Sequence, residues 1–378
     1  MFSKKKSKTV VVVGGGVIGS MHAWLALAAG HKVIHLERDL APQSASIRNF
    51  GLVWVSGRAA GAELALGLRA RELWETIGLQ AEIGFRANGS LTVAQNDAEL
   101  EILREAVQMA DASARGFELL SSTQVKWLEP VLNGNHLGAL RCTTDAVVEP
   151  PMLLGGLRAA MLGNERYSWH PHYDVVKYKK TDSGHTVKSA AGVKVSGDLI
   201  AFVPGAAHHG FLSDYFEDAP IRKVRLQMGA TVPLASELSH SVADGDSLRY
   251  YPAFKDLSLH TLPTQEGIAA ERKMQLLLVQ RLDGSCTIGD THEYEEPFDH
   301  ELSEAPYEHL SQVIANLFGT TAPKIERRWD GVYSQSTSTD IYFRKEIERG
   351  AVIITGGGGR GNSLAPAIAE ETMQSWGI

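Results

Sequence analysis

The stretch T-V-V-V-V-G-G-G-V-I-G, residues 9–19, decides how this chain folds. Its first five residues are all β-branched, which is typical of a parallel strand that is buried on both faces. An alanine-rich run after it predicts a helix, and residues 32–36 predict a second strand. Three glycines between the first strand and the helix have the spacing G-x-G-x-x-G: Gly14, Gly16 and Gly19. Glycines at this spacing allow a tight turn and a close approach of the backbone to a pyrophosphate.

Glu37 follows the second strand at nearly the distance, about 20 residues beyond the glycines, where an acidic residue binds a ribose hydroxyl. The positive end of the helix would face the phosphates. The alternative is an ordinary glycine-rich turn in a parallel sheet, but the complete strand–turn–helix–strand unit favours dinucleotide binding. An acid at position 37 would repel the extra phosphate of NADP, so it favours FAD or NAD.

Length and composition limit the remaining possibilities. A chain of 378 residues predicts about two domains, and a net charge of −7 gives no electrostatic case for a nucleic-acid partner. The basic cluster Lys4, Lys5, Lys6 and Lys8 precedes an apolar run too short for a signal peptide, and no stretch is long enough to span a membrane. The two cysteines, Cys142 and Cys286, fit a reducing cytoplasm, and no metal-ligand spacing predicts a metal site.

A polar loop, A-P-Q-S-A-S-I-R-N-F-G-L-V-W-V-S-G at 41–57, follows the first unit. It is either a surface loop or a clamp on a ligand. We favour the clamp because ligands bind at this edge of such sheets. Further along, residues 249–289 predict several strands, among them 249–254 and 257–262, and so an antiparallel block. Near the end, a buried strand at 352–355 runs into a second glycine loop and a helix that Asn362 or Ser363 would cap.

These features together resemble the FAD-dependent family of D-amino acid oxidase, glycine oxidase and monomeric sarcosine oxidase. The motifs that carry the resemblance are V-V-V-G-G-G-V-I-G at 11–19, Glu37, D-A-V-V-E-P at 145–150, the strand at 198–203 with P-G-A after it, W-D-G at 329–331 and G-G-G-G-R-G-N-S-L-A-P-A-I at 356–368. The resemblance implies an α/β plus α+β fold, with a Rossmann-like FAD-binding domain and a discontinuous antiparallel-sheet substrate domain. It implies an FAD-binding domain at 1–85, 145–222 and 322–378, and a substrate domain at 86–144 and 223–321.

The resemblance also implies a set of residues around the cofactor. Those residues are Gly14, Gly16, Val17, Ile18, Glu37, Arg38, Ser44, Ser46, Arg48, Asn49, Val176, Gly205, Gly357, Gly358, Gly359, Arg360, Gly361, Asn362 and Ser363. Sarcosine oxidases attach their flavin to a late cysteine, and residues 331–339 contain none, so noncovalent FAD is expected. A helix N-terminus near Asn362, with Arg360 close by, would stabilise the negative charge of reduced flavin.

The activity implied is oxidative deamination of a small anionic primary or secondary amine. Hydride would pass to the flavin N5, the imine would hydrolyse, and O₂ or another acceptor would take the electrons, O₂ giving H₂O₂. The segment R-N-F-G-L-V-W at 48–54 is similar to a branch associated with phosphonate catabolism. An aminophosphonate such as N-methyl-2-aminoethylphosphonate is therefore the favoured substrate. The alternatives are an oxidase or dehydrogenase of glycine, sarcosine or D-amino acids, and a flavoprotein that binds FAD only structurally.

The acid group of such a substrate needs a cationic partner. The sequence offers Arg48, Arg225, Arg249, Arg281 and Arg360, with Tyr250, Tyr251, His260 and His292 as polar neighbours. Each of them taken alone has a structural role as its alternative. From this set we predict a catalytic group of Arg48, Arg249, Tyr251, His260 and Arg360. The sequence does not predict the oligomeric state.

Overall fold

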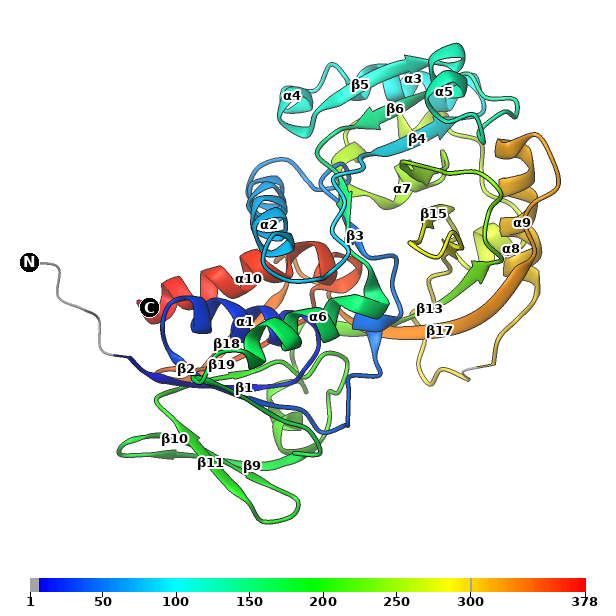
Figure 1. The fold of residues 1–378 in the computed structure, drawn as a ribbon. Helices are drawn as coiled ribbons and strands as arrows, with labels where there is room; N and C mark the ends of the chain where they lie inside the picture. The colour runs from blue at the N-terminus through cyan, green and yellow to red at the C-terminus, as the bar shows by residue number, and fades with distance from the viewer. Residues whose placement is uncertain (1–6, 300) are drawn as a thin grey trace, which may run out of the picture.

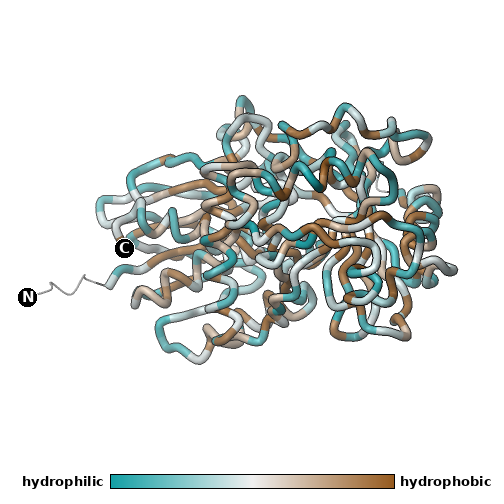
Figure 2. Tube along the Cα trace, turned by 90° about the horizontal axis from the view of Figure 1, so that it is seen from above, coloured by the Kyte–Doolittle hydropathy of each residue, from teal (hydrophilic) through white to brown (hydrophobic). Residues whose placement is uncertain are grey.

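The computed structural model describes residues 7–299 and 301–378, so three members of the basic cluster, Lys4, Lys5 and Lys6, lie outside the described residues. Two large sheets organise the described chain (Figure 1). The first sheet carries the N-terminal unit, and the second lies at the upper right of the view. Figure 2 shows that the hydrophobic stretches lie mainly in the interior of both halves, while the outermost loops are mostly hydrophilic.

The first sheet has six strands in the order β18-β19-β12-β1-β2-β8. Its strands are β1 (Thr9–Val13), β2 (Lys32–Leu36), β8 (Tyr167–His170), β12 (Leu199–Phe202), β18 (Phe343–Glu348) and β19 (Ala351–Thr355). All pairings are parallel except the one between β18 and β19, which closes the edge. Four helices accompany it: α1 (Val17–Ala28), α2 (Ala62–Gly78), α6 (Pro150–Leu162) and α10 (Gly361–Trp376). The predicted strand–turn–helix–strand unit is confirmed.

The central strand β1 is buried on both faces, as its β-branched run predicts. Val10 and Val12 pack on one face in a cluster that includes residues of α1, α6 and α10. Val11 packs on the other face with Val175 and Val187. The latter two belong to a three-stranded antiparallel sheet made of β9 (Val175–Thr181), β10 (Gly184–Ser189) and β11 (Lys194–Gly197). This half is therefore built of three layers, which Figure 1 shows as helices, sheet and small sheet.

The second sheet has eight strands in the order β17-β13-β16-β15-β14-β4-β6-β5. Its strands are β4 (Ser90–Ala94), β5 (Phe117–Ser121), β6 (Gly138–Cys142), β13 (Ile221–Thr231), β14 (Ser241–Ala243), β15 (Leu277–Gln280), β16 (Cys286–Gly289) and β17 (Ile325–Ser336). All neighbours are antiparallel except β4 and β14. The helices of this half are α3 (Asp97–Ala106), α4 (Ala112–Arg115), α5 (Ser122–Leu128), α7 (Ser247–Tyr250), α8 (Gly267–Glu271) and α9 (Ala305–Phe318).

Short elements complete the described chain. A two-stranded ladder joins β3 (Leu52–Val53) to β7 (Ala146–Val147), and five 3₁₀ turns occur at η1 (Ala45–Ile47), η2 (Gly210–Tyr215), η3 (Pro252–Phe254), η4 (Leu259–Thr261) and η5 (Gly358–Arg360). We propose that the two large sheets mark the two domains. In that division β17 goes with the larger sheet, because it pairs along its whole length with β13.

The predicted strands at 249–254 and 257–262 are wrong. This part of the chain forms α7, η3 and η4 instead. The Ser247 hydroxyl donates to the Asp244 carbonyl oxygen at 2.6 Å, which favours a helical turn, and Pro252 opens η3 with a fixed φ angle. Apolar residues of both stretches, among them Phe254 and Leu262, pack into one core cluster without forming strands. Arg249, Tyr251 and His260 therefore lie on short helical turns rather than on a sheet.

Within residues 7–299 and 301–378, no helix is both long and apolar enough to cross a membrane. The same residues contain no group of three or more histidine, cysteine or acidic side chains arranged to hold a metal ion.

We expect Gly19→Ala to destabilise the protein and to weaken its hold on any ligand at the first glycine loop. A methyl group at position 19 would lie 1.9 Å from the carbonyl oxygen of Gly14, so the turn before α1 would have to move. Such overpacking costs about 1–3 kcal/mol or more. Gly155→Ala in α6 is the matched control, because its methyl group meets nothing within 4 Å. Thermal unfolding measures both variants, and an unchanged midpoint for Gly19→Ala would contradict the close packing.

Candidate active site

A cavity of about 1470 Å³ is lined by residues from both halves of the molecule. Ordinary small-molecule pockets measure about 300–1,000 Å³. The first sheet contributes the glycine loops after β1 and β19, and the second contributes residues of β13, β17 and α7. The cavity therefore has room for a dinucleotide together with a small substrate.

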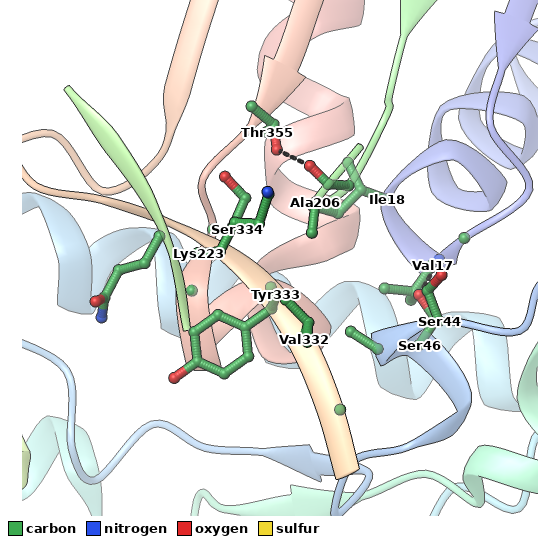
Figure 3. A pocket seen from close by; sticks show the side chains of 18 of the residues that line it. Val17, Ile18, Ser44, Ser46, Ala206, Lys223, Val332, Tyr333, Ser334 and Thr355 are labelled. Atoms are coloured by element: carbon green, nitrogen blue, oxygen red, sulfur yellow. Dashed lines mark hydrogen bonds between the residues drawn. The ribbon is translucent and has the colours of Figure 1, made fainter. Parts of the chain in front are cut away.

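The first glycine loop forms one wall of this cavity. Gly14 has a φ of +117°, and a Cβ there would lie 2.3 Å from the carbonyl oxygen of Val203, so only glycine fits. At the start of α1 the Val17 N–H donates to the Ser46 hydroxyl at 3.0 Å. Figure 3 shows Val17, Ser44 and Ser46 lying together on one side of the cavity. The predicted clamp loop thus meets the positive end of α1, where a pyrophosphate would bind.

Glu37 lies beside this loop with its carboxylate held by backbone donors. The Gly15 N–H donates to Oε2 at 2.7 Å and the Asp39 N–H donates to Oε1 at 3.0 Å. The side chain is 8% exposed and lines the cavity. Because each carboxylate oxygen has further acceptor capacity, Glu37 could also accept a hydrogen bond from a ribose hydroxyl.

The second glycine loop forms another part of the cavity wall, next to Ile18 of α1. The Thr355 hydroxyl donates to the carbonyl oxygen of Gly205 at 2.6 Å, which joins the end of β19 to the turn after β12 (Figure 3). Gly358 has a φ of +58°, and α10 begins at Gly361 with its N-terminus at the cavity. The flavin ring of FAD could lie here, where helix N–H groups favour negative charge.

The predicted cap of α10 is wrong. The residue at the N-cap is Arg360, and its side chain makes no capping bond. The Asn362 amide donates to the Leu52 carbonyl oxygen at 3.1 Å, and the Ser363 hydroxyl both donates to that oxygen and accepts from the Trp54 N–H. These side chains fix residues 52–54 against α10 instead. The Asn362 Oδ1 is buried without a partner among the described residues and so remains able to accept from a ligand.

All of the predicted cofactor-binding residues line this one cavity. They are Gly14, Gly16, Val17, Ile18, Glu37, Arg38, Ser44, Ser46, Arg48, Asn49, Val176, Gly205, Gly357, Gly358, Gly359, Arg360, Gly361, Asn362 and Ser363. The cavity combines two glycine loops, two helix N-termini and an acidic residue beside the first of them. The residues present therefore fit FAD.

A pair of arginines that share one carboxylate also lines the cavity, and one of them, Arg360, belongs to the second glycine loop. The Glu63 carboxylate contacts Arg58 Nη1 at 3.3 Å through Oε1 and Arg360 Nη1 at 3.1 Å through Oε2. Arg58 is 2% exposed, and its Nε has no partner among the described residues. Burial lowers the pKa of Arg58, while Glu63 opposes that shift. One carboxylate between two guanidinium groups leaves a net positive charge that could receive an anion.

Three tyrosines stand beside these arginines. The hydroxyl groups of Tyr250 and Tyr333 are 3.4 Å apart, and Figure 3 shows Tyr333 projecting from β17. A Cβ built on Gly359 would lie 3.3 Å from the Tyr250 hydroxyl, so the tyrosine pair borders the second glycine loop. Burial raises the pKa of Tyr250 to about 12, so it stays a neutral phenol. Tyr251 packs against Trp54 with ring centroids 5.7 Å apart.

The structure brings together only part of the predicted catalytic group. Arg360 and Tyr251 line the cavity near Arg58. Arg48 and Arg249 also line it but are engaged elsewhere. Arg48 donates to the carbonyl oxygens of Gln43 and Asp330, and Arg249 pairs with Asp246 at 3.0 Å and donates to the Pro263 carbonyl. His260 is exposed on η4 and is not among the residues that line the cavity.

The remaining candidate arginines are structural. Arg225 is buried and pairs with Asp330 and Glu293 at 3.0 Å, and Arg281 donates to the Thr287 hydroxyl. Neither is among the residues that line the cavity. Sequence reasoning missed Arg58, whose only signal is its position directly after the polar loop at 41–57.

Comparison with known proteins adds three findings. A family described as "DAO: FAD dependent oxidoreductase" matches residues 9–375. One of the component chains of opine oxidase from Rhizobium meliloti is 30% identical over 164 residues, which cover 40% of this chain and 44% of that protein. Mitochondrial sarcosine dehydrogenase of Homo sapiens is 29% identical over 148 residues, which cover 37% of this chain and 16% of that protein. The match thus spans less than half the length of either curated relative.

The fold also matches solved structures along its whole length. Glycine oxidase from Bacillus cereus superposes with a TM-score of 0.78 at 19% identity, and the match covers 98% of this chain and 95% of that one. At this identity the likeness concerns the fold.

Replacing Glu37 by Ala should lower FAD affinity by about tenfold or more. The charge-assisted hydrogen bond to ribose is worth about 1.5–3 kcal/mol, and ~1.4 kcal/mol corresponds to one decade of affinity. Titration of the apoprotein with FAD measures the change. Glu165→Ala, at an exposed position, is the control. Equal dissociation constants for wild type and Glu37→Ala would reject the role of Glu37.

Proposed function

This chain belongs to the family of FAD-dependent oxidoreductases, and from that membership we propose that it oxidises the carbon–nitrogen bond of a small anionic amine. The observation that carries the proposal is a single cavity with two different ends. One end is a cradle of glycine loops and helix N-termini, and the other, which begins at Arg360 in the second loop, is a group of arginines and tyrosines. A substrate held at the second end would lie next to the flavin ring.

The residues of the chain contribute binding and orientation. Bound FAD supplies the acceptor for the two electrons that leave the substrate. Arg58 and Arg360 would hold the acid group, since Glu63 fixes both guanidinium groups and satisfies only one of their charges. The hydroxyls of Tyr250 and Tyr333 would line one side of the space between that acid group and the second glycine loop. Positioning of this kind lowers the entropic cost of the reaction.

For the substrate class we favour an aminophosphonate. A phosphonate dianion has three acceptor oxygens and is best met by more than one guanidinium group, which Arg58 and Arg360 offer. The alternative is an amino acid such as glycine, sarcosine or a D-amino acid, whose carboxylate would need one arginine and a tyrosine. The names of the relatives, opine oxidase and sarcosine dehydrogenase, favour this alternative.

We further propose noncovalent attachment of FAD. Residues 331–339 contain no cysteine, and neither Cys142 nor Cys286 is among the residues that line the cavity. Burial raises the pKa of both thiols, which keeps them unreactive. The electron acceptor is either O₂ or another molecule, and release of peroxide under air separates the two.

N-methyl-2-aminoethylphosphonate should bleach the flavin faster than sarcosine does at equal concentration under nitrogen. The reason is the paired guanidinium groups, which match a dianion better than a monoanion. Flavin absorbance measures the reaction at full FAD loading. Faster reduction by sarcosine would assign the protein to amino acid oxidation. A flavin that neither amine bleaches would contradict the proposed function.

Arg58→Met should raise the apparent KM at least tenfold and leave FAD loading unchanged. The substitution removes the charge, while Glu63 keeps Arg360 as its partner, so no carboxylate is left unpaired. Binding energy that is equal in ground and transition states appears in KM. Arg104→Met, at an exposed ion pair on α3, is the matched control. An unchanged KM for Arg58→Met would remove Arg58 from the substrate site.

A further inference from the structure

The segment Asp290-Thr291-His292, directly after β16, places two titratable side chains on one side of an extended chain. Thr291 points into the sheet, where its hydroxyl accepts from the Gln227 N–H at 2.8 Å. Neighbours of an extended residue point the opposite way. Asp290 accordingly lines the cavity. Backbone bonds from Asp290 N–H to Gln275 O at 2.9 Å and from His292 N–H to Arg272 O at 2.8 Å hold the segment in place.

Asp290 is 6% exposed, and few groups near its carboxylate offset the negative charge. Gln275 Nε2 donates to its Oδ1 at 3.3 Å, and His292 Nε2 lies 4.0 Å from its Oδ2. Among the described residues no lysine or arginine forms an ion pair with it. Burial raises the pKa of Asp290, and His292 and Gln275 oppose the shift. A carboxylate in this setting is a stronger base than one in water.

His292 lies next to Asp290 and is held in place from its other side. Its Nδ1 lies 3.0 Å from the Lys273 carbonyl oxygen, which can only accept, so Nδ1 carries a hydrogen. This contact fixes the ring with its Nε2 4.0 Å from the Asp290 Oδ2. Lys273 has a φ of +47°, a backbone conformation that residues with a side chain disfavour. In this conformation its carbonyl oxygen faces the His292 Nδ1.

Asp290 lines the cavity near the tyrosines, and His292, which is not among the lining residues, lies next to it. The His292 ring packs on Tyr250 with centroids 4.3 Å apart, and Tyr250 borders the second glycine loop. Gln275 also lines the cavity, is 3% exposed, and its Oε1 has no partner among the described residues. Asp290 and Gln275 therefore present acceptor oxygens to the cavity. They lie near the same two tyrosines, Tyr250 and Tyr251, as the cationic Arg58.

We propose that Asp290 is a catalytic residue that removes a proton from the ammonium group of the substrate, with His292 as its positioning residue. The inference rests on the proposed function. An N–H bond of the ammonium breaks, the proton moves to the Asp290 carboxylate, and nitrogen keeps the electron pair. The adjacent C–H bond then breaks with its two electrons, which pass to bound FAD. The nitrogen lone pair forms the C=N bond of a cationic imine, which water hydrolyses.

The need for such a base follows from the acidity of amines. An alkylammonium group has a pKa near that of lysine, about 10.4, so roughly one molecule in a thousand is neutral at pH 7. Only the neutral amine can give up a hydride. The groups that face Asp290 are His292, Gln275, Tyr250, Tyr251, Tyr294 and Tyr333, and the glutamine and the tyrosines are neutral at this pH. Asp290 is thus free to act on a bound cation.

Anaerobic flavin reduction by N-methyl-2-aminoethylphosphonate and by sarcosine, measured between pH 7 and 10, tests the proposal. The wild-type rate at limiting substrate should change little with pH. Asp290→Asn should be about a hundredfold slower at pH 7 and should rise about tenfold per pH unit, because it depends on neutral amine from solution. Asp256→Asn, at an exposed position, is the matched control and should follow the wild type. His292→Gln should slow reduction and change the profile in the same direction, which a purely structural role would not do.

A binding measurement checks the contact without turnover. The probes are (2-amino-2-methylpropyl)phosphonate, which has no hydrogen on the carbon next to nitrogen, and (2,2-dimethylpropyl)phosphonate, in which a methyl group replaces the ammonium. Wild type should prefer the ammonium probe by at least tenfold, and Asp290→Asn should lose the preference. Asparagine has nearly the shape of aspartate and no charge to bury, so flavin loading should persist. Asp290→Glu, which retains a carboxylate, should keep both the preference and the flat profile.

The outcomes separate the inference from the proposed function. A wild-type flavin that neither amine bleaches would overturn both. A wild type that is bleached, with an Asp290→Asn rate within threefold at every pH and an unchanged probe preference, would overturn the role of Asp290 alone.

Discussion

The carboxylate of Asp145 holds the segment Val55–Ser56, on which the substrate end of the cavity depends. Its Oδ1 accepts from the Val55 and Ser56 N–H groups at 2.5 and 3.0 Å, and its Oδ2 accepts from the hydroxyls of Ser56 and Ser90 at 2.6 Å each. From the other side Arg115 donates to both carbonyl oxygens of the segment. A buried irregular segment is stable only when its backbone groups are satisfied in this way.

This arrangement connects the two halves of the molecule. Asp145 precedes β7, Ser90 begins β4 of the larger sheet, and Arg115 ends α4. The same residues fix where the chain enters α2, and so they fix Arg58 opposite α10. The positive charge that remains on Arg58 and Arg360 is therefore set by contacts among segments far apart in the sequence, while Asp290 supplies a negative charge from the segment after β16. A zwitterionic ligand would complement both.

The cofactor end could be predicted from the sequence, whereas most of the substrate end could not. The first glycine loop, Glu37 and α1 are a local unit, in which the requirements of a turn and of a helix N-terminus are visible in consecutive residues. Arg58 pairs with Glu63, five residues later, but it meets Arg360 and the tyrosines only through folding, and its position after the polar loop is a weak signal. The strand prediction at 249–254 missed the turn at Asp244–Ser247 and the helix start at Pro252, so it placed Arg249 and Tyr251 on a sheet instead of on short helical turns.

This difference between the cofactor end and the substrate end explains how proteins can share the fold while the side chains of their cavities differ. Backbone N–H groups, carbonyl groups and glycine conformations form the cradle, and these depend little on side-chain identity. Glycine oxidase from Bacillus cereus accordingly superposes along the chain at only 19% identity. At the substrate end, selectivity comes from side chains whose charges must balance within a buried space, where an unpaired charge is costly. The charges of four residues therefore depend on one another: Arg58, Glu63, Arg360 and Asp290. A substitution that changes the charge of one of them changes the net charge that the other three must balance.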